Sequence, residues 1–167
     1  MNTFNKSSIY IALAAILGAS TASAANVEVQ WQDPQHYRDV ESPWGAQTKF
    51  QQSIFKELDK TFQKEAARLP ADQTLHVTVN NLDLAGQVEY FWHGYPEGLR
   101  VIRRVDFPRM ELSYRLLGAD NKVLKQGEAK LQNLGFQDDI RAAFDPSPLR
   151  YEKSLVRDWA QKTFTEQ

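Results

Sequence analysis

The sequence predicts an α+β fold in two layers: a mostly antiparallel sheet of about five strands, with a long helix after the first strand and a C-terminal helix packed on one face. Apolar and polar side chains alternate over residues 27–31, 75–79 and 110–116, which is the period of a strand with one buried face. Apolar side chains recur every third or fourth residue over residues 46–69 and 151–160, as in amphipathic helices. Because each element has only one apolar face, the two layers should pack together and the opposite sheet face should be polar.

The first 24 residues have the pattern of a secretory signal peptide. Lys6 is followed by an apolar run over residues 9–19 and then by the small-residue cleavage site Ala22-Ser23-Ala24. The apolar run is shorter than the roughly 20 residues that span a membrane, although an uncleaved N-terminal anchor is the alternative. We expect cleavage after Ala24, one α+β domain over residues 25–167, no stable membrane insertion after cleavage, and a periplasmic location.

Composition excludes several classes of protein. The chain has no cysteine, which excludes disulfides, thiol catalysis and lipid attachment to a cysteine. Its 20 basic and 21 acidic side chains give a net charge of −1. This balance argues against a general nucleic-acid binder, which needs a cationic surface. We expect a monomer whose partner is an envelope protein or a glycan.

The first half of the chain should form a strand, a helix and a second strand. Pro34 and Pro43 indicate a loop between the first strand and the helix, and Pro70 ends the helix. The two strands should be parallel, since a helical crossover joins them. The apolar positions change from odd to even numbers at Leu82 and Leu84, which requires a bulge near residues 80–81 if the strand continues.

The second half should form a bent strand, a hairpin and a helix. Val101, Val105 and Phe107 mark the strand, which Pro108 interrupts. Residues 110–131 form the hairpin around a turn at residues 118–121, with a bulge at Gly127 where the apolar parity of the second arm changes. Residues 133–144 are loop or short helix. Ser147 as N-cap, followed by Pro148, begins the last helix.

Motifs for catalysis or metal binding are absent from the sequence. His36, His76 and His93 have no partner at metal-ligand spacing. No Gly-x-Ser-x-Gly elbow and no glycine-rich phosphate loop occurs. The sequence therefore predicts no cofactor, no metal site and no assigned catalytic residue, and His76 is read as an outward-facing residue of a strand.

Two clusters are candidates for binding a ligand or partner. The first is aromatic, and the second is the only cluster of arginines. Aromatic side chains give large contact area, and guanidinium groups suit anions, but the same residues can also close the core or form structural salt bridges. The candidate binding residues are Tyr90, Phe91, Trp92, His93, Tyr95, Arg100, Arg104 and Arg109.

A carboxylate pair is the alternative source of chemistry. Asp83 and Asp106 both stand beside apolar residues, so both can be partly buried, and two carboxyl groups that share a site can act as acid and base. The structural alternative is that each pairs with an arginine or caps a turn.

Five motifs, in the same order, span nearly the whole expected mature chain. They are Asp33-Pro34-x-x-Tyr37-x-Asp39, Leu82-Asp83-Leu84-Ala85-Gly86, Arg100-Val101-Ile102-Arg103, Pro108-Arg109-Met110-x-Leu112-x-Tyr114, and Tyr151-Glu152-Lys153 followed by Trp159. By these motifs the chain resembles a family of small secreted bacterial proteins, domain of unknown function 3016. The resemblance implies a periplasmic or secreted domain with no assigned catalytic residue. It directs attention to a polar network whose candidate members are Asp83, Asp106, Glu152 and Lys153.

These observations favour a non-catalytic binding or interaction module of the cell envelope, which would use the aromatic loop, the arginines or the open sheet face. The alternative is a hydrolase that acts on an envelope glycan or phosphoester through Asp83 and Asp106. A third reading, a purely structural or stress-related envelope protein, predicts aromatic side chains packed inside and no pocket.

Overall fold

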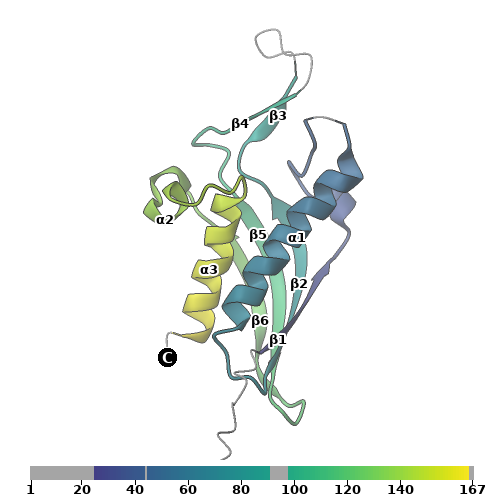
Figure 1. Ribbon diagram of the computed structural model, residues 1–167, viewed down its shortest axis with the longest axis vertical. Helices are drawn as coiled ribbons and strands as arrows, with labels where there is room; N and C mark the ends of the chain where they lie inside the picture. Colours follow the sequence, from purple (N-terminus) through teal and green to yellow (C-terminus); the bar gives the residue numbers. More distant parts are fainter. Residues whose placement is uncertain (1–24, 44, 91–97, 166–167) are drawn as a thin grey trace, which may run out of the picture.

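The computed structural model describes residues 25–43, 45–90 and 98–165, and its main element is a four-stranded sheet of order β1-β2-β5-β6 (Figure 1). The strands of this sheet are β1 (Asn26–Trp31), β2 (Thr74–Asp83), β5 (Arg109–Leu117) and β6 (Val123–Gln132). A separate ribbon pairs β3 (Gln87–Glu89) with β4 (Leu99–Val101). β1 is parallel to β2, and the other pairs are antiparallel. The predicted α+β class and mostly antiparallel sheet are confirmed.

Two long helices, α1 (Gln47–Ala66) and α3 (Arg150–Phe164), lie side by side on one face of the sheet (Figure 1). The short elements are η1 (Pro34–His36), η3 (Phe136–Asp138) and α2 (Ile140–Ala143). Both long helices cover the same face, and the described residues leave the opposite face of the sheet open. None of the helices within the described residues has the length and apolar composition needed to cross a membrane.

The core lies between these two layers. Leu58 and Phe62 of α1, Val77 of β2 and Val156 of α3 are almost completely buried. Phe62 meets the ring of Trp159 edge to face at a centroid distance of 6.0 Å, a favourable geometry for aromatic pairs. The helical stripe and the strand alternation that the sequence shows therefore face each other, as expected.

The predicted bulge in β2 is present. The pairing of β2 with β5 shifts between Val79 and Asn81, and the strand then continues to Asp83. Val79 and Leu82 are both fully buried. The extra residue thus keeps apolar side chains on the core face on both sides of the irregularity.

The predicted hairpin is also present, but its bulge is elsewhere. Gly127 pairs regularly with Tyr114, and the register shift lies between Leu116 and Leu117, next to the turn. A Cβ on Gly127 would lie 3.2 Å from the Tyr114 hydroxyl oxygen. The glycine therefore makes room for a ring packed across it, and Leu124, which prompted the bulge prediction, simply faces solvent with 55% exposure.

The segment between the ribbon and the hairpin is not the one strand that the sequence suggested. Val101 ends β4, whereas the Asp106 N–H donates to the Arg103 carbonyl in a turn, and Val105 is 74% exposed. The main sheet consequently has four strands instead of about five, because Val101 pairs with the short strand β3.

The last helix begins two residues later than Pro148. Ser147 accepts a hydrogen bond from the Leu149 N–H at 3.2 Å, and the Arg150 N–H donates to the Ser147 carbonyl. Ser147 thus caps the turn that leads into α3 instead of the helix itself. Within residues 133–144, Asp139 is an N-cap that accepts from the Arg141 and Ala142 N–H groups of α2.

Candidate functional site

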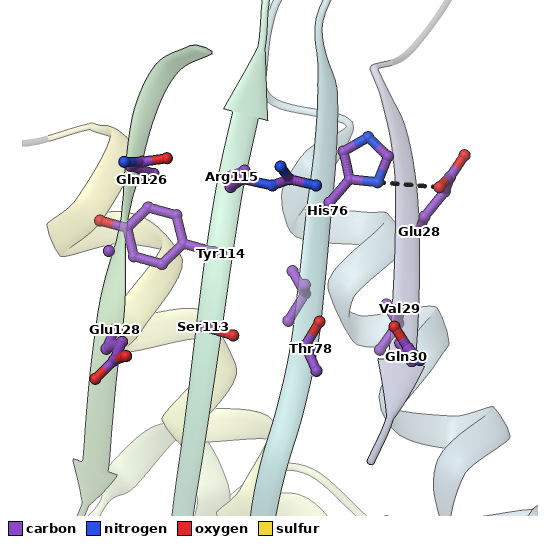
Figure 2. A pocket seen from close by; sticks show the side chains of 12 residues that line it. Glu28, Val29, Gln30, His76, Thr78, Ser113, Tyr114, Arg115, Gln126 and Glu128 are labelled. Atoms are coloured by element: carbon purple, nitrogen blue, oxygen red, sulfur yellow. Dashed lines mark ion pairs between the residues drawn. The ribbon is translucent and has the colours of Figure 1, made fainter.

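The open face of the sheet carries a hollow of about 640 Å³ (Figure 2). Alternate residues of all four strands point toward it because their neighbours in sequence face the helices. The residues that line the hollow are Glu28, Val29, Gln30, His76, Val77, Thr78, Ser113, Tyr114, Arg115, Gln126, Gly127 and Glu128.

The polar side chains of the hollow form two rows across the sheet. Strand pairing aligns Glu28, His76, Arg115 and Gln126 in the first row. The second row consists of Gln30, Thr78, Ser113 and Glu128. Neighbouring strands lie about 4.8 Å apart, so each row presents hydrogen-bonding groups at short, regular intervals.

The polar side chains of the first row are only partly paired. His76 Nδ1 lies 3.0 Å from Glu28 Oε2, as the dashed line in Figure 2 marks. Arg115 extends from β5 toward His76 (Figure 2) and makes no hydrogen bond or ion pair with any residue that the structure describes. Since a guanidinium group has five N–H donors, Arg115 can bind an acceptor that comes from solvent.

Of the described residues that line the hollow, only Tyr114 is aromatic. The ring of Tyr114 packs edge to face on the rings of Trp159 and Phe164 in the core, at centroid distances of 5.5 and 5.7 Å. Tyr114 therefore lines the hollow from the core side of the sheet. The hollow therefore offers mainly hydrogen-bonding and charged side chains. This chemistry suits hydrophilic molecules.

The predicted aromatic cluster lies mostly outside the described residues. This applies to Phe91, Trp92, His93 and Tyr95. Tyr90 is described: it is 49% exposed, and its hydroxyl donates to Glu41 Oε1 at 2.8 Å. That hydrogen bond raises the pKa of Tyr90.

The structure places Arg100 among backbone carbonyls. Its guanidinium donates to the carbonyl oxygens of Gly86 at 2.9 Å and Asp39 at 2.5 Å, and also to those of Ala85 and Glu41. Burial lowers the pKa of Arg100, while Asp39, Glu152 and Glu41 oppose this effect. Arg100 therefore holds the loop after β1 against the turn after β2.

The other two candidate arginines, Arg104 and Arg109, have different partners from Arg100 and from each other. Arg104 binds both carboxylate oxygens of Asp138, at 2.9 and 3.2 Å, on the surface. Arg109 forms an ion pair with Asp83 at 2.6 Å and stacks over Phe107 at 3.9 Å. None of the three lines the hollow on the sheet.

Asp83 is buried, and the carboxyl group that approaches it is that of Asp39, not that of Asp106. Burial raises the pKa of Asp39, and so do the charge of Asp83 and a side-chain hydrogen bond between Asp39 and Asp83. Asp106 instead lies 4.0 Å from Arg103. Neither Asp83 nor Asp106 lines the hollow on the sheet or a smaller one of about 420 Å³ between the ends of α1 and α3.

Glu152 is the most deeply buried acid among the described residues. Its Oε1 accepts the Ala85 N–H at 2.7 Å, and its Oε2 has no hydrogen bond to a described residue. Burial raises the pKa of Glu152 to about 6. Its neighbour Lys153 faces the other way and lies 3.4 Å from Glu57 of α1.

Asp83, Arg100, Arg109 and Glu152 thus converge at the end of β2, where they fix the turn over residues 84–86. Gly86 has φ +77°, and a Cβ there would lie 2.5 Å from the Val101 carbonyl oxygen. Arg100 and the Asp83–Arg109 ion pair are held by protein partners, which is typical of a scaffold, whereas Glu152 Oε2 has no hydrogen bond to a described residue. The chain's described residues contain no group of three or more His, Cys, Asp or Glu that could hold a metal ion.

Sequence reasoning predicted the polar sheet face but did not select residues on it. Arg115 and Glu128 were not predicted as site residues, because isolated charges on alternating strands are common. The signal that could have found them is strand parity, which places both on the face opposite the helices.

Comparison with known proteins gives a family but no activity. No curated protein matches the chain. The family model DUF3016, described as a protein of unknown function, matches residues 25–162, which covers every strand and nearly all of α3. The chain therefore belongs to the DUF3016 family.

Proposed function

We propose that this protein is an exported, monomeric, non-catalytic binding module of the bacterial cell envelope, and that its open sheet face receives a hydrophilic ligand. The observation that carries the proposal is the hollow of about 640 Å³ lined by two complete cross-strand rows of polar side chains. Pockets that place hydrogen-bonding groups convergently are the usual locations of ligand sites.

The location in the envelope rests on the N-terminal pattern. Lys6, the apolar run over residues 9–19 and Ala22-Ser23-Ala24 support export. An exported protein without a nucleotide motif meets glycans, peptides and other envelope components. A hydrophilic ligand from the cell wall is therefore the class that we favour.

A hydrolase that uses Asp83 and Asp106 receives less support from the geometry. An acid and a base must both reach the substrate, yet Asp83 is buried against Arg109 and Asp39. Arg103, at 4.0 Å, is the ion-pair partner of Asp106. Neither carboxyl group opens into the hollow on the sheet.

The test is a titration of the isotope-labelled protein, monitored by the NMR shifts of its backbone amides. The probes are soluble cell-wall fragments, as glycan chains with and without their attached peptides. We expect shifts in β2, β5 and β6 around the hollow. The variant His76→Ala/Arg115→Ala should lose them, whereas Lys122→Ala, in the hairpin turn beside Asp120, should not.

Two results would contradict the proposal. One is a folded spectrum in which no fragment shifts the amides around the hollow. The other is conversion of a fragment into product, together with loss of that turnover in Asp83→Asn or Asp106→Asn, because this outcome would favour the hydrolase.

A further inference from the structure

The β3–β4 ribbon is attached to the rest of the domain mainly through polar contacts. Neither of its strands joins the main sheet, and the ribbon extends past the end of that sheet (Figure 1). All residues of β3 and β4 are exposed or half-buried. The Gly98 N–H donates to the Pro43 carbonyl oxygen at 3.0 Å, beside the contact of Tyr90 with Glu41. An element that buries this little surface can open without unfolding the domain.

Arg100 of β4 makes the most extensive of these contacts. Its guanidinium group donates to the carbonyl oxygens of Asp39 and Glu41, at 2.5 and 3.1 Å, in the loop after β1. It also donates to those of Ala85 and Gly86, at 3.4 and 2.9 Å, just before β3. One side chain therefore joins β4 to two loops of the domain.

A buried carboxyl group lies next to this attachment. Glu152 is 1% exposed, and its Oε1 accepts the Ala85 N–H at 2.7 Å. Its Oε2 makes no hydrogen bond to a described residue. A buried carboxylate with an unbound oxygen is costly, whereas a protonated carboxyl group has no charge to remove from water. The closed position of the ribbon therefore favours the protonated form of Glu152.

We propose that the β3–β4 ribbon is a proton-controlled arm, which is held against the domain while Glu152 is protonated and is released when Glu152 ionises. Release takes the Arg100 guanidinium group off the loop carbonyls and admits water to the Glu152 carboxylate. This inference goes beyond the proposed function and does not depend on it, because the arm and the hollow on the sheet face share no residue.

The charges that face Glu152 come from two elements. Arg100 of β4 and Arg150 of α3 both favour the ionised form, but burial is the larger effect and raises the pKa of Glu152 from 4.5 to about 6. The neighbouring Lys153 points to Glu57 of α1 instead. With the ribbon closed, Glu152 therefore binds a proton at a higher pH than a glutamate in water does.

The acids on the other side of Arg100 act in the same direction. Burial raises the pKa of Asp39, and so do the charge of Asp83 and a hydrogen bond with it, while Arg100 and Arg38 oppose this change. Glu41 is a further negative charge that faces Arg100. Because the closed position holds protons more tightly than the open one, closure is strongest in acidic solution and weakens as the pH rises.

The two pKa values limit the size of the effect. In the open position, water would return the pKa of Glu152 toward its ordinary value of 4.5, from about 6 in the closed position. The equilibrium constant for opening should then increase as the pH rises through about 6, by at most about thirtyfold, since each pKa unit is worth a factor of ten.

The experiment is amide hydrogen exchange of the isotope-labelled protein, followed by NMR between about pH 5 and about pH 7.5. The reporters are the amides of Gly98 and Ala85, which bind the Pro43 carbonyl and Glu152. Their protection factors, which correct for the intrinsic effect of pH on exchange, should fall at least about fivefold over this range. Low urea should leave these protection factors unchanged but reduce that of Val77 in the core, because only global unfolding exposes much surface.

Variants identify the two groups of the arm. Glu152→Gln keeps an acceptor for the Ala85 N–H and should remove most of the fall with pH, whereas the control Glu57→Gln, at an exposed acid of α1, should keep it. Arg100→Lys should lower the protection of Gly98 at every pH, and the surface variant Arg104→Lys should not. In the wild type, the carboxyl carbon shift of Glu152 should titrate with the same midpoint as the fall, a check that requires no variant to fold.

Protection of the reporter amides that is level with pH would overturn the inference. Protection that rises with pH would do the same, because the attraction between Arg100 and the carboxylates would then outweigh burial. An equal fall in Glu152→Gln, or reporter amides that respond to urea as Val77 does, would also contradict it. None of these results bears on the hollow, so failure of this inference leaves the proposed function to its own test.

Discussion

Glu152→Gln should change how the stability of the fold depends on pH. Burial raises the pKa of Glu152 to about 6, although the Ala85 N–H and the positive charges of Arg100 and Arg150 work in the opposite direction. The ordinary pKa of a glutamate is 4.5. The folded protein therefore holds this proton more tightly than the unfolded chain, and ionisation of Glu152 destabilises the fold.

The magnitude follows from the two pKa values. The increase from 4.5 to about 6 corresponds to about 2 kcal/mol, because one pKa unit is worth about 1.4 kcal/mol. This part of the free energy of unfolding is fully present below about pH 4.5 and is lost as the pH rises through about 6. Glutamine keeps an acceptor for the Ala85 N–H and does not titrate.

Urea unfolding, followed by tryptophan fluorescence from about pH 4.5 to about pH 7.5, measures the effect. The free energy of unfolding of the wild type minus that of Glu152→Gln should fall by about 2 kcal/mol across this range. Glu57→Gln is the control: Lys60 and Lys153 lower the pKa of the exposed Glu57, so its difference should change in the opposite direction. A difference for Glu152 that stays level with pH would refute the reasoning.

Three further predictions concern the turn at the end of β2 and the N-terminus. Gly86→Ala should lower the free energy of unfolding by about 2–5 kcal/mol, since it adds a steric clash with Val101 to a left-handed backbone. Gly45 also has a positive φ, +84°, but an added Cβ would lie in open space, so Gly45→Ala should lower the free energy of unfolding by only about 1–2 kcal/mol. Equal losses for the two variants in urea unfolding would contradict this. Arg100→Met should cost about 2–4 kcal/mol because it leaves several carbonyls without their donor. The surface variant Arg104→Met should cost less, since exposed ion pairs contribute little, and a reversed order in thermal unfolding would be the contrary result. After expression of the full chain in a bacterial host, the intact mass should correspond to a protein that begins at Ala25, and recovery of only the uncleaved form would contradict cleavage after Ala24.

Local patterns were sufficient for most of the fold. The alternation in β2 and β5 and the stripe of α1 each reflect one buried face, and burial depends mainly on nearby sequence. The bulge between Val79 and Asn81 was predictable because the apolar parity changes there. Such features need no knowledge of distant partners.

Features set by distant contacts were not predictable. Gly127 accommodates the Tyr114 ring from the neighbouring strand, and Val101 pairs with β3 instead of joining the main sheet. Both depend on which strand lies alongside, which a single sequence does not reveal.

The candidate site shows the same division. The sequence indicated a polar network near Asp83 and Glu152, and the structure places both at the end of β2. The sequence could not show that Arg100 donates hydrogen bonds to backbone carbonyls or that the carboxyl group beside Asp83 is that of Asp39. The hollow was not predictable because its two rows combine residues of β1, of β2 and of the β5–β6 hairpin, which are far apart in sequence.

The most direct test of a binding role for the open sheet face is a map of amide shifts on addition of peptide-bearing cell-wall fragments. The account predicts that the affected amides cluster around His76, Ser113, Arg115 and Gln126, and that Arg115→Gln weakens the response at least tenfold. Shifts confined to other surfaces, with those around the hollow unchanged in a folded protein, would contradict it.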